Sequence, residues 1–273
     1  MIAWVSGIYD EPELYQLACA YRDVPAEVTA LLAWCARHCA LPGGRPAGSV
    51  LELAAGPGEH ARELAGRGLR ATALDRSPAM CAYAAAQAKS SGADLDVVEG
   101  DMRDFRIEGT FDVAVTMLNS LCHLFILDDL VRHLVAVHGH LAAGGLYIVE
   151  LAHPADFFTP VPRTSSEWAI DAGGVHADVR WGGREDRIDP LTQVTREHMT
   201  ITATSEDGTI RTVSDVVPNR FWTLTEFRAA VALANARAES GGFELVASYG
   251  DFDETTELDA PTAWRMILIL RAA

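Results

Sequence analysis

The stretch from Val50 to Gly58, Val-Leu-Glu-Leu-Ala-Ala-Gly-Pro-Gly, holds the residues whose types and spacing say most about chemistry. A short apolar run of strand length breaks at Gly56 and Gly58, and residues 59–65 are typical of a helix. A strand that turns into a helix through glycines exposes backbone N–H groups and admits a ligand where no Cβ intervenes. We therefore expect a nucleotide-type binding turn here.

Acidic side chains follow the next two expected strands. Asp75 ends the strand at residues 70–75, and Asp101 follows the strand at 94–99. The first carboxylate can accept hydrogen bonds from two ribose hydroxyls, and the second from an exocyclic amine. Either acid alone could be a helix cap or a solvated loop charge. Because ligands of parallel sheets bind at the carboxyl ends of the strands, the three positions together favour one adenosine-type ligand.

The acid inside the first strand separates two interpretations of the turn. Gly56-x-Gly58 followed by Ala61 weakly allows a dinucleotide fingerprint. Glu52 lies in an otherwise apolar strand, where a buried carboxylate needs a partner near the turn. The pattern Glu-x-x-x-Gly-x-Gly resembles the opening motif of class I S-adenosylmethionine (SAM) methyltransferases, in which the glycines lie against the methionine part of the cofactor.

The resemblance covers residues 50–152 and resumes at the C-terminus. These residues are similar to the small-molecule branch of the family, which includes glycine and aminosugar N-methyltransferases. It implies SAM as cofactor, with S-adenosylhomocysteine as product. Asp75 would hold the ribose, while Asp101 and the Met102 backbone would contact the adenine. Leu118 would offer its carbonyl to the ammonium of the cofactor. The full cofactor-binding set that it implies is Tyr15, Arg22, Glu52, Ala54, Gly56, Gly58, Asp75, Arg76, Met80, Asp101, Met102 and Leu118.

The order of expected elements predicts an α/β fold. Strands alternate with helices up to residue 152, which implies a parallel sheet. The resemblance implies a Rossmann-like methyltransferase fold with seven mostly parallel strands, helices on both faces and a last strand that is antiparallel. We expect a helical lid at residues 1–45, a SAM-binding core at 46–153, an inserted antiparallel β cap at 154–220 and completion of the core at 221–273.

Two residues of the lid have alternative interpretations. Tyr15 and Arg22 could close over the cofactor, with Arg22 meeting its carboxylate in a charge-assisted pair. Alternatively, Tyr15 is a half-buried packing residue and Arg22 pairs with Asp23 or Glu27 on the surface.

Candidates for methyl-transfer chemistry follow the fourth and fifth strands, because these residues would face the sulfonium. His123 is the first choice as general base, since an imidazole can titrate near working pH; a satisfied structural histidine is the alternative. Candidates for acceptor binding are Asn119, His153, Trp168 and Arg220. His153 could instead be a turn residue before Pro154, and large aromatic residues in a thin β layer are often its core.

Composition limits the partners. The formal net charge of −16 argues against nucleic acid and anionic membranes, and it mildly favours a neutral or amine-bearing small acceptor. The five cysteines fit reduced thiols, no cluster has metal-ligand spacing, and no apolar run is long enough to cross a bilayer. We expect a cytoplasmic monomer or homodimer, and we place His133, His138 and His140 on the surface of a helix.

The main prediction is methyl transfer from SAM to a nitrogen or oxygen of a small molecule. Two other functions stay open. A non-catalytic SAM-binding subunit would keep the same cofactor residues. A NAD-dependent oxidoreductase would also use the glycine turn and Asp75, although the chain has no Tyr-x-x-x-Lys pair and Lys89 is its only lysine.

Overall fold

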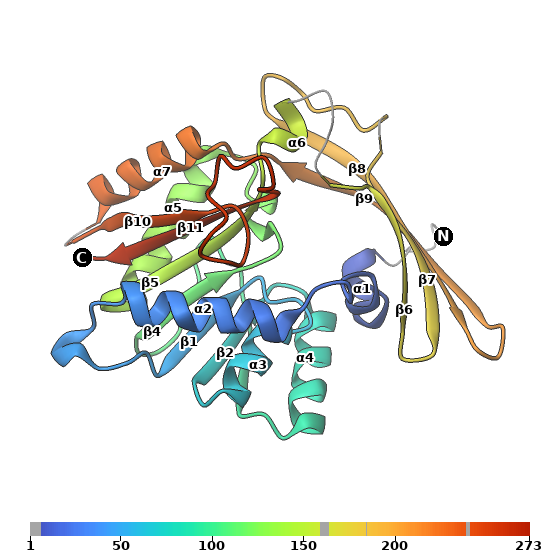
Figure 1. The fold of residues 1–273 in the computed structure, drawn as a ribbon, viewed down its shortest axis with the longest axis horizontal. Coiled ribbons are helices and arrows are strands. Elements are labelled where there is room, and N and C mark those ends of the chain that lie inside the picture. The colour runs from blue at the N-terminus through green and yellow to red at the C-terminus, as the bar shows by residue number, and fades with distance from the viewer. Residues whose placement is uncertain (1–6, 159–163, 184, 239–240) are drawn as a thin grey trace.

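The main sheet of the computed structural model has the strand order β10-β11-β5-β4-β1-β2-β3 (Figure 1). The structure describes residues 7–158, 164–183, 185–238 and 241–273. The strand β11 lies between β5 and β10 and is antiparallel to both, while the other neighbouring strands are parallel. This confirms the expected seven-stranded, mostly parallel sheet with its antiparallel last strand. The strands are β1 (Ser49–Leu53), β2 (Arg70–Asp75), β3 (Leu95–Glu99), β4 (Phe111–Thr116), β5 (Leu141–Ala152), β10 (Phe243–Tyr249) and β11 (Arg265–Ala272).

Helices cover both faces of this sheet. On one face α2 (Val24–His38) and α3 (Glu59–Gly66) pack against the sheet, and on the other α5 (Leu127–Gly139) and α7 (Leu224–Arg237) do so. The helix α4 (Pro78–Ser91) lies along β2 and β3. Local sequence explains the helix starts: Ser77 caps α4 ahead of Pro78, and Thr223 forms a capping box with Glu226 at α7.

A second sheet forms the cap. Its four strands, β6 (Glu167–Ala172), β7 (Val175–Trp181), β8 (Val194–Ser205) and β9 (Ile210–Arg220), are antiparallel in sequence order. The first elements of the chain, η1 (Ile8–Asp10) and α1 (Pro12–Ala18), pack against one face of this sheet (Figure 1). Ile8 and Leu14 share a buried cluster with Met199 and Ile201 of β8. The lid and the cap therefore have one common hydrophobic core. Three short helices complete the described structure, η2 (Pro42–Gly44), η3 (Ser120–His123) and α6 (Ala155–Phe158).

The structure corrects one expected surface position. His133 is fully buried in α5, where its ring nitrogens lie 2.7 Å from the Met102 carbonyl oxygen and 2.6 Å from the Tyr147 hydroxyl. The prediction that His133 lies on the surface is therefore wrong. Its partners, Met102 in a loop and Tyr147 in β5, are distant in the sequence, so the residues around His133 give no sign of them. Burial lowers the pKa of His133 to about 4, so the ring is neutral.

One glycine of β5 is fixed by a close approach. Gly144 has a φ of +77°, and its carbonyl accepts a hydrogen bond of 2.8 Å from the Ala40 N–H after α2. A Cβ at this position would collide with the Ala40 carbonyl.

We expect Gly144→Ala to lower the free energy of unfolding by ~1–3 kcal/mol, because an L side chain is strained at this φ and meets backbone. Urea denaturation measures the change. The matched control is Gly139→Ala at the end of α5, where nothing lies within 4 Å of an added Cβ and no loss is expected. Equal denaturation midpoints for Gly144→Ala and the unsubstituted protein would contradict the prediction.

Candidate active site

The carboxyl ends of the central strands open onto a cavity of about 1290 Å³ that is bounded by the core, the lid and the cap. Pockets for one drug-sized ligand are typically ~300–1,000 Å³, so this cavity has room for a cofactor and a small acceptor together. We call its two parts the cofactor end, with Ala54, Gly56, Asp75, Asp101 and Leu118, and the acceptor end, with Trp168, Trp181, Glu197, Asp215 and Asn219. The other sequence-predicted residues on its wall are Tyr15, Arg22, Arg76, Met80, Met102, Asn119 and His123.

The backbone takes rare conformations where two neighbouring strands end at this cavity. Ala54 follows β1 with a φ of 52°, and Leu118 and Asn119 follow β4 with φ values of 53° and 57°. Left-handed backbone at residues with a Cβ is uncommon and tends to concentrate at functional sites. The Asn119 amide oxygen also accepts a hydrogen bond of 3.1 Å from the Ala152 N–H. Its side chain therefore ties the ends of β4 and β5 together as well as lining the cavity.

The Asp75 carboxylate is held by backbone N–H groups and can accept further hydrogen bonds. Its oxygens accept bonds from the Gly56 N–H at 2.7 Å and the Ser77 N–H at 2.8 Å. Burial raises its pKa, and among the described residues no cation lies in ion-pair contact with it. A carboxylate has about four acceptor positions, so Asp75 can still accept from the hydroxyls of a ribose. The site thus fits the adenosine part of the expected cofactor at this residue.

Asp101 faces the same end but already has a partner. Its oxygens accept from the Arg103 Nε at 3.0 Å, and this guanidinium lowers the pKa of the carboxyl. About a third of the Asp101 side chain is exposed. An adenine amine at this position would therefore share the carboxylate with Arg103.

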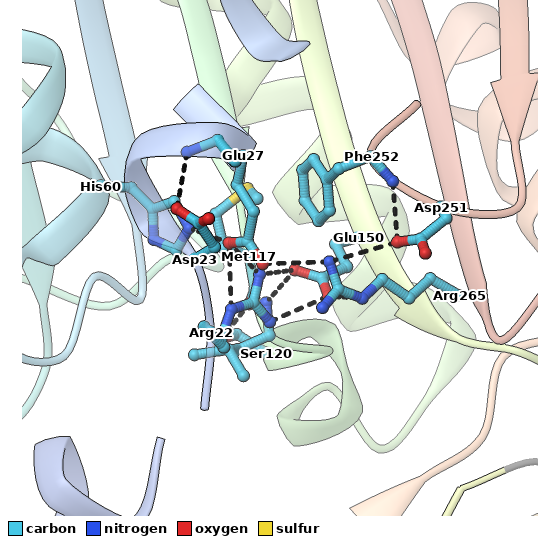
Figure 2. A network of polar contacts seen from close by, with 12 residues as sticks. Arg22, Asp23, Glu27, His60, Met117, Ser120, Glu150, Asp251, Phe252 and Arg265 are labelled. Carbon is cyan, nitrogen blue, oxygen red and sulfur yellow. Dashed lines mark hydrogen bonds and ion pairs between the residues drawn. The ribbon is translucent and has the colours of Figure 1, made fainter. Parts of the chain in front are cut away.

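Arg22 stands in a buried network of charges beside the cofactor end (Figure 2). Its guanidinium donates to the Glu150 oxygens at 3.0 and 2.8 Å and to Glu27 at 2.7 Å. Figure 2 shows Arg265 on the opposite side of Glu150 from Arg22, with its Nε 3.4 Å from a Glu150 oxygen. Only 3% of the Arg22 side chain is exposed. The pairing with Glu27 matches one sequence interpretation, but the pair is buried and does not lie on the surface.

The network fixes the ionisation of its members. Burial disfavours a charged Glu150, yet Arg22 and Arg265 lower its pKa to about 2. Burial also disfavours a charged His60, but hydrogen bonds to Glu27 and Glu52 raise its pKa to about 9. The Glu150 carboxylate further accepts a bond of 2.8 Å from the Leu118 N–H. Through Glu150, Arg22 therefore helps to fix the position of the backbone just after β4.

Two residues expected to bind the cofactor lie outside the cavity wall. Glu52 is buried, and its carboxylate accepts a bond of 2.7 Å from the Ala61 N–H at the start of α3. This is the expected partner near the turn, but it keeps the side chain away from the ligand space. Gly58 caps α3 with a φ of 70°, and a Cβ there would lie 3.2 Å from Ala84. Gly58 thus allows the close packing of two helices.

Two residues expected to bind the acceptor also lie elsewhere. The His153 Nε2 is 2.9 Å from the Leu258 carbonyl oxygen, and its Nδ1 accepts a bond of 3.1 Å from the Ala155 N–H. This is the arrangement of a turn residue, as the alternative interpretation expected. Arg220 donates to the Phe125 carbonyl at 2.8 Å and to Glu226 at 3.0 Å. Partners distant in sequence hold both side chains outside the main cavity.

His123 lies on the cavity wall at the end of η3. Its Nε2 is 3.0 Å from the Tyr9 hydroxyl, and a row of ring contacts leads from Tyr9 through Tyr15 to Trp181 of the cap. Burial and the charge of Arg76 lower the pKa of His123 to about 4. The expectation that this imidazole titrates near working pH is therefore not met: the ring is neutral and a weak base.

Tyr9 and Glu197 also line the wall, although neither is among the candidates named from the sequence. A signal for Glu197 exists in the alternation of β8: it shares a strand face with the buried Thr195 and Met199, so an acid stands at an inward position.

Comparison with known proteins agrees with this geometry. Residues 50–145 match the family model described as "Methyltransferase domain". These residues are similar to class I SAM-dependent methyltransferase domains. The similarity supports SAM as the cofactor and methyl transfer as the reaction.

The methyltransferase domain and its flanks are similar to several characterised proteins. The dTDP-3-amino-3,4,6-trideoxy-alpha-D-glucopyranose N,N-dimethyltransferase of Streptomyces venezuelae is 28% identical over 71% of this chain and 77% of its own length. The cypemycin N-terminal methyltransferase of a Streptomyces species is 30% identical over 55% of this chain, and the match spans only 59% of that enzyme.

Solved structures share the fold over nearly the whole chain. Streptomyces venezuelae DesVI superposes with a TM-score of 0.75 at 21% identity, over 96% of this chain and 98% of its own. SAM-bound CalS10 of Micromonospora echinaspora, an amino pentose methyltransferase, gives a TM-score of 0.65 at 20% identity, over 94% of this chain and 96% of its own. At these identities the likeness concerns the fold.

Two features are absent from the described residues. Ranges 7–158, 164–183, 185–238 and 241–273 contain no helix long and apolar enough to span a bilayer. The same ranges contain no group of three or more His, Cys, Asp or Glu side chains placed to hold a metal ion.

The network around Arg22 predicts how stability depends on pH. In the folded protein the pKa of His60 is about 9, against an ordinary value of 6.5. The contribution of His60 to the free energy of unfolding is therefore complete below pH 6.5 and is lost as the pH rises through 9. We expect unfolding free energies from urea titrations to fall by ~3 kcal/mol across this window, and His60→Gln to remove most of that slope. The exposed His198 supplies the control: His198→Gln should keep the slope of the unsubstituted protein. An unchanged slope in His60→Gln would show that His60 is not the titrating group.

Proposed function

We propose that this chain transfers the methyl group of SAM to an amine nitrogen of a small molecule, with an aminosugar as the acceptor class. The observation that carries this proposal is the chemistry of the acceptor end. Glu197 and Asp215 place carboxyl groups on its wall, and Trp168 and Trp181 line it with aromatic rings. Acids and π faces favour a cationic or amine-bearing ligand.

Relatives support the acceptor class. The protein of Streptomyces venezuelae and a second relative from Streptomyces fradiae are both named as N,N-dimethyltransferases of dTDP-linked 3-aminosugars. The second is 31% identical over 56% of this chain and 56% of its own length. These names support nitrogen over oxygen as the methylated atom.

The cofactor end has a residue for each part of SAM. We assign the ribose to Asp75, the adenine to Asp101 and Met102 with Met80 beneath it, and the methionine part to Ala54 and Gly56. We assign the ammonium to Leu118, which follows β4, and the carboxylate to Arg22, a lid cation on the cavity wall that also pairs with Glu27 and Glu150. When bound, SAM supplies a methyl group already activated by its sulfonium, so the protein has only to orient the nucleophile and exclude water.

His123 and Tyr9 are suited to orient the acceptor. The neutral imidazole, 3.0 Å from the Tyr9 hydroxyl, can share a hydrogen bond with an amine without carrying a proton. Asn119 supports this arrangement by holding the turn before η3. In this role His123 aligns the nitrogen lone pair, and a different group must remove the proton.

Two alternatives give different outcomes in binding and transfer experiments. A non-catalytic subunit would bind S-adenosylhomocysteine but transfer nothing. A NAD-dependent oxidoreductase would bind NADH and ignore S-adenosylhomocysteine. Neither has a specific observation in its favour at the acceptor end.

The test is transfer of label from methyl-labelled SAM to dTDP-3-amino-3,4,6-trideoxy-α-D-glucopyranose. The matched control acceptor is the same sugar nucleotide with a hydroxyl in place of the amine. We expect label in the amine only, because an amine needs no stronger base than the site provides. Label in the hydroxyl sugar alone would contradict the proposal, and label in neither, with S-adenosylhomocysteine bound, would favour the silent subunit.

For His123→Ala we expect kcat/KM for the aminosugar to fall by ~10–100-fold, because one positioned hydrogen bond to the nucleophile is lost. The dissociation constant for S-adenosylhomocysteine, measured by calorimetry, should stay within about twofold, since the ring lies outside the proposed cofactor contacts. A conservative His123→Gln should recover part of the activity. Unchanged turnover in His123→Ala would remove the residue from the mechanism.

A further inference from the structure

Glu197 stands at an inward position of the cap sheet. In β8 it shares a strand face with Thr195 and Met199, which are 3% and 1% exposed. It lines the wall of the acceptor end, and a Cβ added at Gly182, just after the neighbouring strand β7, would lie 3.5 Å from its carboxyl carbon. The cap therefore directs this acid toward the acceptor end.

A short chain of hydrogen bonds fixes this carboxyl relative to the rest of the site. The Asn219 amide nitrogen of β9 donates to a Glu197 oxygen at 2.6 Å. The amide oxygen of Asn219 accepts from the Cys122 Sγ at 3.1 Å. Cys122 directly precedes His123 in η3. Glu197 is thus tied to the segment that presents His123 to the cavity.

Glu197, which is partly buried, differs from most buried acids of the protein. Glu27, Glu150 and Asp112 each form an ion pair with an arginine, whereas in the described part of the chain no cation lies within 4 Å of Glu197. A buried carboxylate without a counter-ion holds its proton more strongly and is completed by a cationic ligand.

The surroundings support reversible protonation at neutral pH. Burial raises the pKa of Glu197 to about 7; the Asn219 hydrogen bond opposes this rise, and the negative charge of Asp186, after β7, adds to it. Two other titratable groups, Cys122 of η3 and Tyr9 of η1, interact electrostatically with Glu197. Burial raises the pKa of both, so they remain neutral, and Asp186 is paired with His198 at 2.6 Å.

We propose that Glu197 is the proton acceptor of the reaction, taking the proton that an ammonium acceptor must lose before its nitrogen can attack. The proposal rests on the proposed amine acceptor. It also accounts for a site in which His123 is too weak a base for this step.

The step balances without a further reactant. One N–H bond of R–NH₃⁺ breaks and its proton forms an O–H bond with Glu197, leaving R–NH₂ with a free lone pair. The nitrogen then forms the N–C bond while the S–C bond breaks and its electron pair stays on sulfur. The product is R–NH₂CH₃⁺ with S-adenosylhomocysteine, and Glu197 returns its proton to solvent.

The experiment combines a direct titration with kinetics. In protein labelled with ¹³C at the glutamate carboxyl carbon, the resonance absent from Glu197→Gln identifies Glu197, and we expect it to titrate near pH 7. With dTDP-3-amino-3,4,6-trideoxy-α-D-glucopyranose as the probe, kcat/KM of the unsubstituted enzyme should rise as the pH increases through 7, because the carboxylate is the active form. Glu197→Gln should lower kcat/KM by ~100-fold or more and remove this rise, while Glu197→Asp retains part of the activity.

Controls separate this role from a structural one. Glu206→Gln, in the exposed turn after β8, should keep the turnover and the pH profile of the unsubstituted enzyme. Melting temperature and S-adenosylhomocysteine affinity of Glu197→Gln should match the unsubstituted protein. A Glu197 resonance that titrates with ordinary glutamates near ~4.3, or a Glu197→Gln enzyme with an unchanged pH profile, overturns the proposal. If the unsubstituted enzyme leaves the aminosugar unmethylated, the amine acceptor is contradicted, and the titration alone then supports or overturns the proton-holding role of Glu197.

Discussion

The ion pair between Arg22 and Glu150 is the interaction on which the arrangement of the cavity depends. It joins the lid to the end of β5, and through Glu150 it also holds Arg265 of β11 and the Leu118 N–H after β4. Burying these charges is costly unless every member is paired and hydrogen-bonded. Here each carboxylate has at least one cation, and His60 adds a further positive charge from α3. The same contacts that satisfy the charges therefore bring five separate segments of the chain to one point.

Electrostatics divides the cavity into two chemically different halves. At the cofactor end, charges are paired or held by backbone N–H groups, as at Asp75, which suits a ligand recognised by hydroxyls and amines. At the acceptor end, the partner of Glu197 within the described residues is a neutral amide. Between them His123 is kept neutral by burial and by Arg76. In the proposed complex, a neutral ring does not compete with SAM for the lone pair of the acceptor nitrogen, whereas a charged imidazolium would.

Local patterns were sufficient for the fold and for placing Asp75 and Asp101 next to strand ends. The glycine turn, Asp75 and Asp101 each depend on a strand end and the residues next to it, so their places in a parallel sheet follow from sequence order. Side chains whose partners lie far along the chain could not be placed in this way. His153 is held by Leu258, Arg220 by Phe125, and His133 by Tyr147 from another strand. The sequence predicted that Glu52 has a partner near the turn. It did not predict that this partner, the Ala61 N–H, would hold the carboxylate away from the cavity.

The hydrophobic cluster shared by Ile8, Leu14 and Ala18 with Val179, Met199 and Ile201 makes two walls of the cavity a single cooperative unit. Local unfolding proceeds in such contiguous units, so the lid cannot detach without loosening the cap. Arg211 of β9 strengthens this link through its contacts with Glu11 and Glu13. For the proposed enzyme, access for the cofactor and access for the acceptor would consequently depend on one opening equilibrium, and a change in the lid that weakens this cluster would alter the binding of both ligands.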